Sequence, residues 1–341
     1  MPVKKGENKK AHPSESEIRQ DIVTGDWVVI ATARAKRPDD FVSAEQPVQE
    51  PKSDPFEDPE ASGQEKDVLI YRRDDGDWSL RVFPNKFPVV QNSRTAKDLS
   101  EGPYFAMSGV GHHEIIVTRD PKRSLALLDT WQVAEVIDAY QERYLALMNK
   151  KTVKYIQIFH NHGKGSGASV LHPHSQLIAI PVVSPGLSLD LAGAERYYRS
   201  TKQDVFSVIV AHELEARKRL IFENEHFVAF CPFASRAAFE IWVVGKRHNP
   251  YFERITDEEK FACAEALQAS LRALHQGLND PGYNFYIHTA PCDGSDYPHY
   301  RWHIEIIPRT ATWAGFELST GIEVSTILPE VSAEFLRKQL Q

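Results

Sequence analysis

The pattern with the most chemical content in this sequence is a pair of alternating histidines followed by a glutamine. His172, His174 and Gln176 lie in the run His-Pro-His-Ser-Gln. Residues two apart in an extended strand point to the same side, so a strand over 171–180 would place all three side chains on one face. An imidazole beside a bound phosphate can attack phosphorus and carry a nucleotidyl group covalently. The run therefore predicts a nucleophile and a helper group at a phosphate site.

A glycine-rich stretch comes just before the histidines. Gly163, Gly165 and Gly167 follow a predicted strand that ends in Asn161-His162. Glycines let backbone N–H groups approach an anion closely, so the stretch predicts a phosphate cradle. Two plainer interpretations stay open: the histidines could be surface or metal-binding groups, and glycine-rich loops are often only flexible.

Length and composition limit the class of protein. The chain has 341 residues, which suits two domains of about 150 residues each. With 42% hydrophobic residues it can bury a sizeable core, and a net charge of -7 argues against nucleic acid as a partner. Residues 1–17 are polar and lysine-rich, so we expect a disordered tail of a cytoplasmic protein without a membrane anchor. The three cysteines are odd in number and widely spaced, which predicts neither disulfides nor a thiolate zinc site.

The first half of the chain predicts short strands around one long helix. Asp129 and Gln132 have the spacing of a capping box, and apolar residues recur at three and four residues from Val133 to Tyr144. The segment 41–67 is rich in Pro, Glu, Asp, Ser and Gln and predicts a solvated loop. β-Branched runs bounded by turn residues predict strands at Val68–Tyr71, Glu114–Val117, Tyr155–Phe159 and Leu177–Ile180.

The second half repeats this order. Thr256 and Glu259 open a predicted helix that runs through Leu274. Strands are predicted at Phe227–Phe230, Phe239–Val244, Phe285–His288 and His303–Ile307. The parallel indicates a duplicated domain, and we place the two units at 18–195 and 196–341. The segment Leu187–Arg219 is predicted to be helical and to connect them.

Several motifs together resemble the galactose-1-phosphate uridylyltransferase family, a tandem-domain branch of the histidine triad superfamily. The resemblance covers most of the chain after the tail. It implies an α+β fold of two tandem histidine-triad-like domains, each an antiparallel half-barrel sheet with packed helices. The motifs are Arg19-x-Asp21-x-x-Thr24-Gly25-x-Trp27, Arg34-Ala-Lys-Arg37-Pro38, Phe83-Pro-Asn85-Lys86-Phe87-Pro88 and the His-Pro-His-Ser-Gln run.

The resemblance also implies roles for individual residues. His174 would be the nucleophile, Gln176 would bind the transferring phosphoryl group, and Asn85 would help to hold the base. His172 would orient the site. Further substrate contacts are expected from Arg34, Arg37, Asn161, Gly167, Ser169, Phe316 and Glu317. As plainer alternatives, the basic turn at 34–37 could be an ordinary solvated turn and Asn85 an ordinary turn residue.

Metal sites of the family are only partly represented here. Relatives bind zinc through a Cys-x-x-Cys pair and two histidines, whereas this chain has Asp54, Glu57 and Pro121 at three of these positions. Carboxylates in a proline-rich loop replace thiolates poorly, so we expect the structural zinc to be absent. In the second half, two imidazoles and a carboxylate predict either one divalent metal site or satisfied polar groups of a strand. These three residues are His288, His303 and Glu305.

The resemblance predicts transfer of UMP from UDP-glucose to galactose 1-phosphate through a uridylyl-histidine, in ping-pong order and without a cofactor for the chemistry. In relatives, the loop that corresponds to 315–321 crosses to the active site of the partner subunit, which implies a homodimer. Phe316 stands where tyrosine is frequent. Two alternatives stay open: an ADP-sugar phosphorylase or dinucleoside-polyphosphate phosphorylase that transfers AMP, and a nucleotide-binding protein without catalysis.

Overall fold

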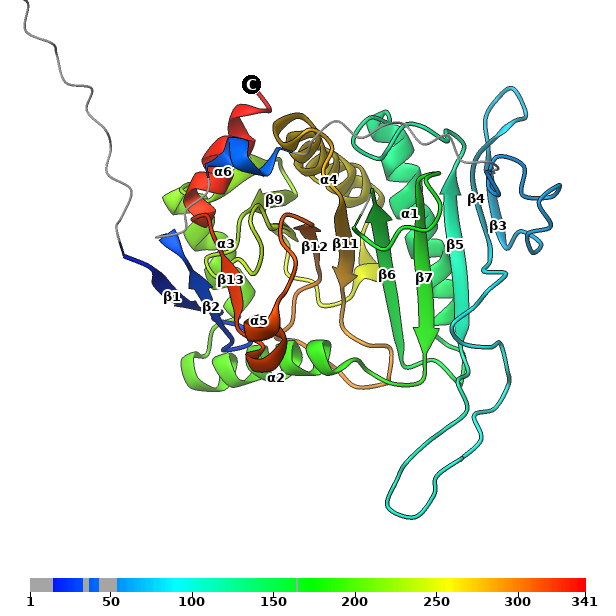
Figure 1. Ribbon diagram of the computed structural model, residues 1–341. Coiled ribbons are helices and arrows are strands. Elements are labelled where there is room, and N and C mark those ends of the chain that lie inside the picture. Colours follow the sequence, from blue (N-terminus) through cyan, green and yellow to red (C-terminus); the bar gives the residue numbers. More distant parts are fainter. Residues whose placement is uncertain (1–14, 33–36, 43–53, 164) are drawn as a thin grey trace, which may run out of the picture.

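The protein is built on one ten-stranded antiparallel sheet that runs through both halves of the chain (Figure 1). The structure is a computed structural model and describes residues 15–32, 37–42, 54–163 and 165–341. Arg34 and most of the predicted tail lie outside the described residues. Along the sheet the strands are β3 (Leu69–Arg72), β4 (Trp78–Pro84), β5 (His112–Thr118), β7 (His174–Ile180), β6 (Tyr155–His162), β11 (Tyr283–His288), β12 (His303–Pro308), β10 (Ile241–Gly245), β9 (Phe227–Phe230) and β8 (Leu220–Glu223).

The strand order reads the same from both ends of the sheet. Each half contributes five strands, and β6 and β11 join the halves by antiparallel pairing. The register repeats as well, because Phe159 pairs with Gln176 in the first half and Tyr286 pairs with Glu305 in the second. The predicted α+β fold class and the repeated order of elements are confirmed. Because the halves share one sheet, residues far apart in sequence become neighbours across β6 and β11.

Two long helices cover one face of the sheet. α1 (Thr130–Leu147) and α4 (Asp257–Leu278) both begin with the predicted capping boxes. The predicted apolar stripe of α1 is buried and packs in the main core with Ile156, Ile158 and Leu177. Since side chains alternate along a strand, Asn161, His174 and Gln176 must lie on the opposite face of the sheet. None of the described helices has the length and apolar content that crossing a membrane requires.

The segment predicted to connect the halves is helical. It forms α2 (Pro185–Thr201) and α3 (Val205–Ala216), separated at Lys202, whose backbone is left-handed. The predicted boundary between residues 195 and 196 falls inside α2 rather than in a loop. The N-terminal strands β1 (Glu17–Gln20) and β2 (Trp27–Ile30) form a small sheet with β13 (Glu323–Ser325) from the C-terminal end. Hydrogen bonding therefore places residues 17–30 beside the second half.

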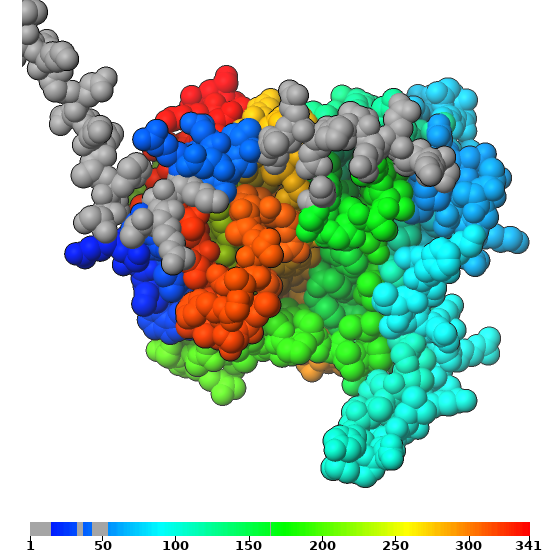
Figure 2. All heavy atoms as spheres, in the orientation of Figure 1, coloured from blue at the N-terminus to red at the C-terminus, as the bar shows by residue number. Residues whose placement is uncertain are grey.

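Short elements and one long excursion complete the chain. The short elements are η2 (Pro38–Phe41), η3 (Phe252–Arg254), α5 (Gly315–Thr320) and α6 (Pro329–Lys338). Figure 2 shows the excursion between β4 and β5 projecting from one corner of the molecule, in cyan. It is held by isolated bridges such as Asp98 to Met107, and its tip exposes Tyr104 and Phe105.

The starts of β7 and β10 differ from the sequence predictions. β7 begins at His174, before the predicted strand Leu177–Ile180 but after Leu171, where an extended stretch holding all three polar side chains would begin, because residues 169–172 form bends. β10 begins at Ile241, since Phe239 has a φ of 64°, which a strand does not allow. The first difference matters for the site, because His172 is not part of the strand face.

The close packing of the N-terminal hairpin on α2 generates a test. A Cβ atom added to Gly193 would lie 1.9 Å from the carbonyl oxygen of Val23, so the backbones must separate to accommodate it. We expect Gly193→Ala to destabilise the fold by about 1–3 kcal/mol and to lower the melting temperature. Gly186→Ala on the same helix is the control, because nothing lies within 4 Å of its added Cβ. Equal melting temperatures for the two variants would show that this contact is not tight.

Candidate active site

His174 is the first residue of β7 and lies on the open face of the sheet. Its Nδ1 is 2.8 Å from the carbonyl oxygen of His172. A carbonyl only accepts, so Nδ1 carries the proton and Nε2 keeps its lone pair. The Phe56 ring packs edge-on against the imidazole, with 5.2 Å between ring centroids. The strand start, the carbonyl and the phenyl ring thus hold the imidazole in one orientation with Nε2 as its nucleophilic atom.

The protonation state of His174 also suits a nucleophile. The side chain is buried, and burial lowers the pKa of His174 below its ordinary value of 6.5. The hydrogen bond to the His172 carbonyl and the carboxylate of Asp54 act in the opposite direction without reversing the shift. The imidazole is therefore neutral at pH 7, the form in which it has a lone pair to donate.

His172 lies just before the first residue of β7, and its ring packs against the same Phe56 ring as His174. Its Nε2 is 2.6 Å from the carbonyl oxygen of Thr118, and its Nδ1 is 2.7 Å from Oδ2 of Asp54. Both ring nitrogens are thus engaged, while the backbone carbonyl of the same residue fixes the tautomer of His174. The expectation that His172 belongs to the same strand as His174 and Gln176 was wrong, because β7 begins at His174.

Asp54, Glu57 and Pro121 stand where relatives have zinc ligands. Among the described residues, only Asp54 of these three contacts His172. Glu57 is exposed in the turn that follows Asp54, and Pro121 is half-buried in the turn after β5. Asp54 therefore meets the His172 ring directly as a hydrogen-bonding carboxylate.

Gln176 is held by a residue that the sequence analysis missed. Nε2 of His113, on β5, lies 2.9 Å from Oε1 of Gln176. His113 Nδ1 accepts from the backbone N–H of Val89 at 3.3 Å, so Nε2 carries the proton and donates to Gln176. The amide oxygen of Gln176 therefore accepts from His113, and the NH2 group of Gln176 points away from His113.

Asn85 joins the same network from the turn after β4. Its backbone N–H donates to the His113 carbonyl oxygen at 2.8 Å, and its Oδ1 accepts from the N–H of Phe87 at 2.8 Å. Its Nδ2 lies 3.2 Å and 3.4 Å from the two ring nitrogens of His113, neither of which can accept from it in this tautomer. The predicted base contact and the predicted phosphoryl contact are thus linked through one histidine. The only signal of His113 in the sequence was its position near the start of a strand, β5, which pairs with β7 in the structure.

The glycine-rich stretch forms a loop between β6 and β7. Gly163 has a φ of 71°, and a Cβ there would lie 3.1 Å from the Cα of Gly282, so glycine is needed for both conformation and space. Asn161 is near the end of β6, and Ser169 and Gly167 are exposed in the loop. The β6–β7 pairing ends with His160 opposite Ser175, so Asn161 and His174 are the next residues along the two strands. The structure therefore brings the predicted cradle beside the predicted nucleophile.

Other predicted contacts lie apart from His174. Arg37 precedes η2, which contacts α4 and whose Phe41 ring packs against the ring of Phe239. Phe316 and Glu317 lie on α5, toward the end of the sheet where β7 finishes (Figure 1). Glu317 accepts from the N–H of Ala314, and Phe316 is half exposed. Among the described residues, no hydrogen bond or ion pair joins these three side chains to the His174 network.

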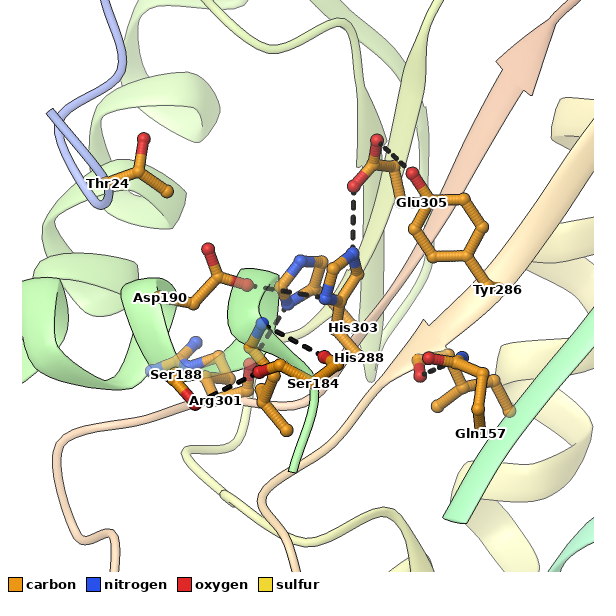
Figure 3. Close-up of polar contacts among 12 residues, drawn as sticks. Thr24, Gln157, Ser184, Ser188, Asp190, Tyr286, His288, Arg301, His303 and Glu305 are labelled. Carbon is orange, nitrogen blue, oxygen red and sulfur yellow. Dashed lines mark hydrogen bonds and ion pairs between the residues drawn. The ribbon is translucent and has the colours of Figure 1, made fainter. Parts of the chain in front are cut away.

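A second polar cluster lies on β11 and β12 of the second half (Figure 3). His303 and Glu305 stand in the register positions that His174 and Gln176 hold in the first half. His303 Nδ1 even repeats the hydrogen bond to the carbonyl two residues earlier, that of Arg301, at 3.0 Å. His288, from β11, stacks on His303 with 4.7 Å between centroids. The cluster is the second-half counterpart of the candidate site.

The charged side chains of this cluster pair with partners of opposite charge. His288 Nε2 is 2.9 Å from Glu305, and its Nδ1 is 3.4 Å from Asp190 on α2. Burial alone would lower the pKa of His288, but the two carboxylates raise it to about 9. Burial lowers the pKa of His303 to about 4, helped by the neighbouring His288. Arg236 contacts Glu305 as well, and it lowers the pKa of that carboxyl in spite of burial.

The predicted metal ligands His288, His303 and Glu305 do come together, but they do not fit a metal ion as arranged. In the part of the chain that the structure describes, no three His, Cys, Asp or Glu side chains are placed to hold a metal. The guanidinium of Arg236 already supplies positive charge to Glu305 and would repel a divalent cation. The alternative from the sequence, satisfied polar groups on a strand, describes the cluster better.

Comparison with known proteins gives the family. A family model described as galactose-1-phosphate uridyl transferase, N-terminal domain, matches residues 7–183. The chain belongs to the galactose-1-phosphate uridylyltransferase family. A model described as a domain of unknown function, DUF4921, matches residues 129–341. The resemblance to this family that was inferred from the motifs is thereby confirmed.

Two relatives align with this chain over nearly its whole length. An ADP-glucose phosphorylase of Arabidopsis thaliana is 33% identical over 347 residues, covering 98% of this chain and 95% of the relative. A galactose-1-phosphate uridylyltransferase of Thermotoga maritima is 26% identical over 333 residues, covering 94% and 98%. The solved structure of an Arabidopsis ADP-glucose phosphorylase with bound ADP-glucose has a TM-score of 0.80 at 29% identity, covering 95% of this chain and 98% of that chain. These relatives support a nucleotidyltransferase function.

The His113 contact predicts a measurable effect on nucleotidyl transfer. We expect His113→Ala to slow transfer about fivefold, because Gln176 loses the donor that fixes its amide, a hydrogen bond worth about 1 kcal/mol. The rate of nucleotide attachment to the protein, followed by intact mass, is the measurement. His112→Ala is the matched control, since among the described residues its side chain has no contact with Gln176. An equal effect of both variants would argue against a role for His113.

The lowered pKa of His174 predicts a titration below the ordinary histidine value. Because burial disfavours the charged form, the imidazole should stay neutral until the pH falls below 6.5. Histidine ring signals measured by NMR as a function of pH, with His174→Ala for assignment, give the midpoint. A midpoint at or above 6.5 would contradict the buried environment described for this ring.

Proposed function

We propose that the protein is a nucleotidyltransferase acting on a nucleotide sugar, with His174 as the nucleophile. The observation that carries the proposal is the hydrogen bond from Nδ1 of His174 to the His172 carbonyl, 2.8 Å long. It leaves Nε2 with a lone pair at the start of β7, next to the glycine-rich loop. Burial keeps this imidazole neutral.

The proposed reaction has two displacements at the same phosphorus atom. His174 Nε2 forms a bond to the α-phosphorus while the bond from that phosphorus to the bridging oxygen breaks, and the sugar 1-phosphate leaves. The ring gains positive charge as the bond forms, and the Nδ1–H donated to the carbonyl stabilises that charge. The acceptor oxygen then attacks the nucleotidyl-histidine, and the imidazole returns to its neutral form.

The developing negative charge on the phosphoryl oxygens needs donors. Gln176 offers the NH2 group that His113 leaves unengaged, and Asn161 offers another from β6. Backbone N–H groups of the glycine-rich loop, including Gly167, and the hydroxyl of Ser169 would surround the phosphates, as predicted also for Arg34. Donors fixed before the substrate binds stabilise a transition state without further reorganisation.

The identity of the donor nucleotide is the finer part of the proposal. The motifs predict UDP-glucose as donor and galactose 1-phosphate as acceptor, with uridylyl-His174 as the intermediate. The 33% identity to an ADP-glucose phosphorylase over 98% of this chain favours a second candidate, adenylyl transfer from ADP-glucose to phosphate. Gly315-Phe316-Glu317-Leu318 fits that branch at least as well. Both candidates use the same nucleophile and differ in base and acceptor.

Cofactor and assembly follow from the family resemblance and are part of the proposal. His174 supplies the nucleophile and the fixed amides supply the donors, so we assign no cofactor to the chemistry and no structural zinc to Asp54 and His172. Phe316 and Glu317 lie on exposed α5, toward the other end of the sheet from His174. We propose that the protein is a homodimer in which these residues approach the sugar in the partner subunit.

The proposal predicts a covalent adduct on His174. Purified protein is incubated separately with UDP-glucose and with ADP-glucose, and its intact mass is taken. We expect a gain of one UMP or one AMP that His174→Ala abolishes, because only its Nε2 attacks the phosphorus. His212→Ala, an exposed histidine on α3, should gain the same mass as the unchanged protein.

The outcomes separate the candidates. UMP attachment supports uridylyl transfer, and AMP attachment supports the adenylyl branch. Binding of either nucleotide without any attachment would favour a non-catalytic nucleotide-binding protein. Attachment that persists in His174→Ala would exclude this residue as the nucleophile.

A further inference from the structure

Three side chains from both halves of the chain form a hydrogen-bonded row beside the glycine-rich loop. Asn284, on β11, pairs directly with Asn161, on β6, so both point to the open face. Asn284 Nδ2 lies 2.6 Å from Oδ1 of Asn161 and 2.8 Å from the backbone oxygen of Ser166. Nε of Arg309 lies 2.5 Å from Oδ1 of Asn284. Asn284 itself is buried.

The chemistry of arginine decides the orientation of both amides in this row. An Asn amide can often be turned over without changing its shape, but an arginine Nε–H can only donate. Oδ1 of Asn284 must therefore face Arg309, and its NH2 group must face Asn161 and Ser166. Asn161 in turn must present its oxygen to Asn284. Its Nδ2 points the other way, and within the described residues this nitrogen has no hydrogen-bond partner.

The same row holds the backbone of the loop. Because Asn284 donates to the carbonyl of Ser166, that carbonyl dipole is turned toward β11 and away from any anion in the loop. Gly163 lies against Gly282, and the backbone N–H of Arg309 donates to the Gly282 carbonyl at 2.7 Å. The second half thus forms the support on which the loop rests.

We propose that Asn284 and Arg309 are positioning residues for the phosphate end of the His174 site. Arg309 orients Asn284, and Asn284 turns the amide of Asn161 so that its NH2 group donates to a phosphoryl oxygen of the nucleotide. The proposal rests on the proposed function and assigns to the second half a part in chemistry performed on the first. The residues act through Asn161 and the loop, not by touching the substrate.

A double-mutant cycle tests whether Asn284 acts through Asn161. The single-turnover rate of nucleotide attachment from ADP-glucose and from UDP-glucose is measured for Asn161→Ala, Asn284→Ala and the double variant. We expect Asn284→Ala alone to slow attachment about ten- to a hundredfold, because the phosphoryl group loses a hydrogen-bond donor and hydrogen bonds to charged groups are strong. In the Asn161→Ala background, Asn284→Ala should slow attachment by less than about threefold. Equal factors in both backgrounds would overturn the proposal, because a merely structural loss persists without Asn161.

Arg309 provides a second test that does not disturb a buried residue. Arg309→Gln keeps an N–H donor for Asn284 and should retain most of the rate, whereas Arg309→Met removes the donor and should slow attachment. Arg272→Met, at an exposed position on α4, controls for the loss of a surface charge. Equal rates for Arg309→Gln and Arg309→Met would show that the donated hydrogen bond has no role.

Failure of the proposed function is recognised separately. If the unchanged protein gains no mass from either donor, or if His174→Ala still gains it, the covalent mechanism fails. The same cycle is then measured on the affinities for ADP and UDP by calorimetry. Coupling between Asn161 and Asn284 in those affinities would support the positioning role, and purely additive losses would reject it.

Discussion

The pairing of β6 with β11 is the constraint on which the rest of the molecule depends. It joins two five-stranded halves into one sheet and aligns Asn161 with Asn284 across the junction. Antiparallel pairing fixes side-chain register to one residue, because a slip by one would turn every side chain to the other face. The core under α1 and α4 is shared by both halves, so this register is fixed by burial as well as by hydrogen bonds.

The duplicated architecture produces two equivalent positions that the chain has filled differently. The first holds a neutral imidazole whose Nε2 has no hydrogen-bond partner among the described residues, and the amide of Gln176 beside it is fixed by His113. The second places a carboxylate, Glu305, where the first has Gln176, and surrounds it with Arg236 and His288. A buried carboxylate needs such partners, since an unpaired charge in the interior is costly. The second position is therefore closed by its own ion pairs, while the first keeps donors unengaged.

Donor-only and acceptor-only groups determine the direction of the polar networks. The His172 carbonyl selects the tautomer of His174, the N–H of Val89 selects that of His113, and the Nε–H of Arg309 selects the orientation of Asn284. In each case one group whose chemistry is fixed decides the state of an ambiguous neighbour. The backbone and a single arginine thereby set the state of the side chains nearest the candidate site.

The repeated order of elements, and the chemistry proposed for His174, could be predicted from the sequence alone. The alternation of His172, His174 and Gln176, the glycine spacing and the two capping boxes are local patterns, and local patterns can be read without knowing what packs against them. The tertiary structure decided which of these groups meet. His113 reaches Gln176 only because β5 pairs with β7, and Asn284 and Arg309 reach Asn161 only through the β6–β11 junction, more than 120 residues along the chain. It also decided that His172 supports the site from outside the strand, and that Arg236 meets Glu305. Contacts of this kind depend on strand order and register, and residue spacing in one chain does not contain that information.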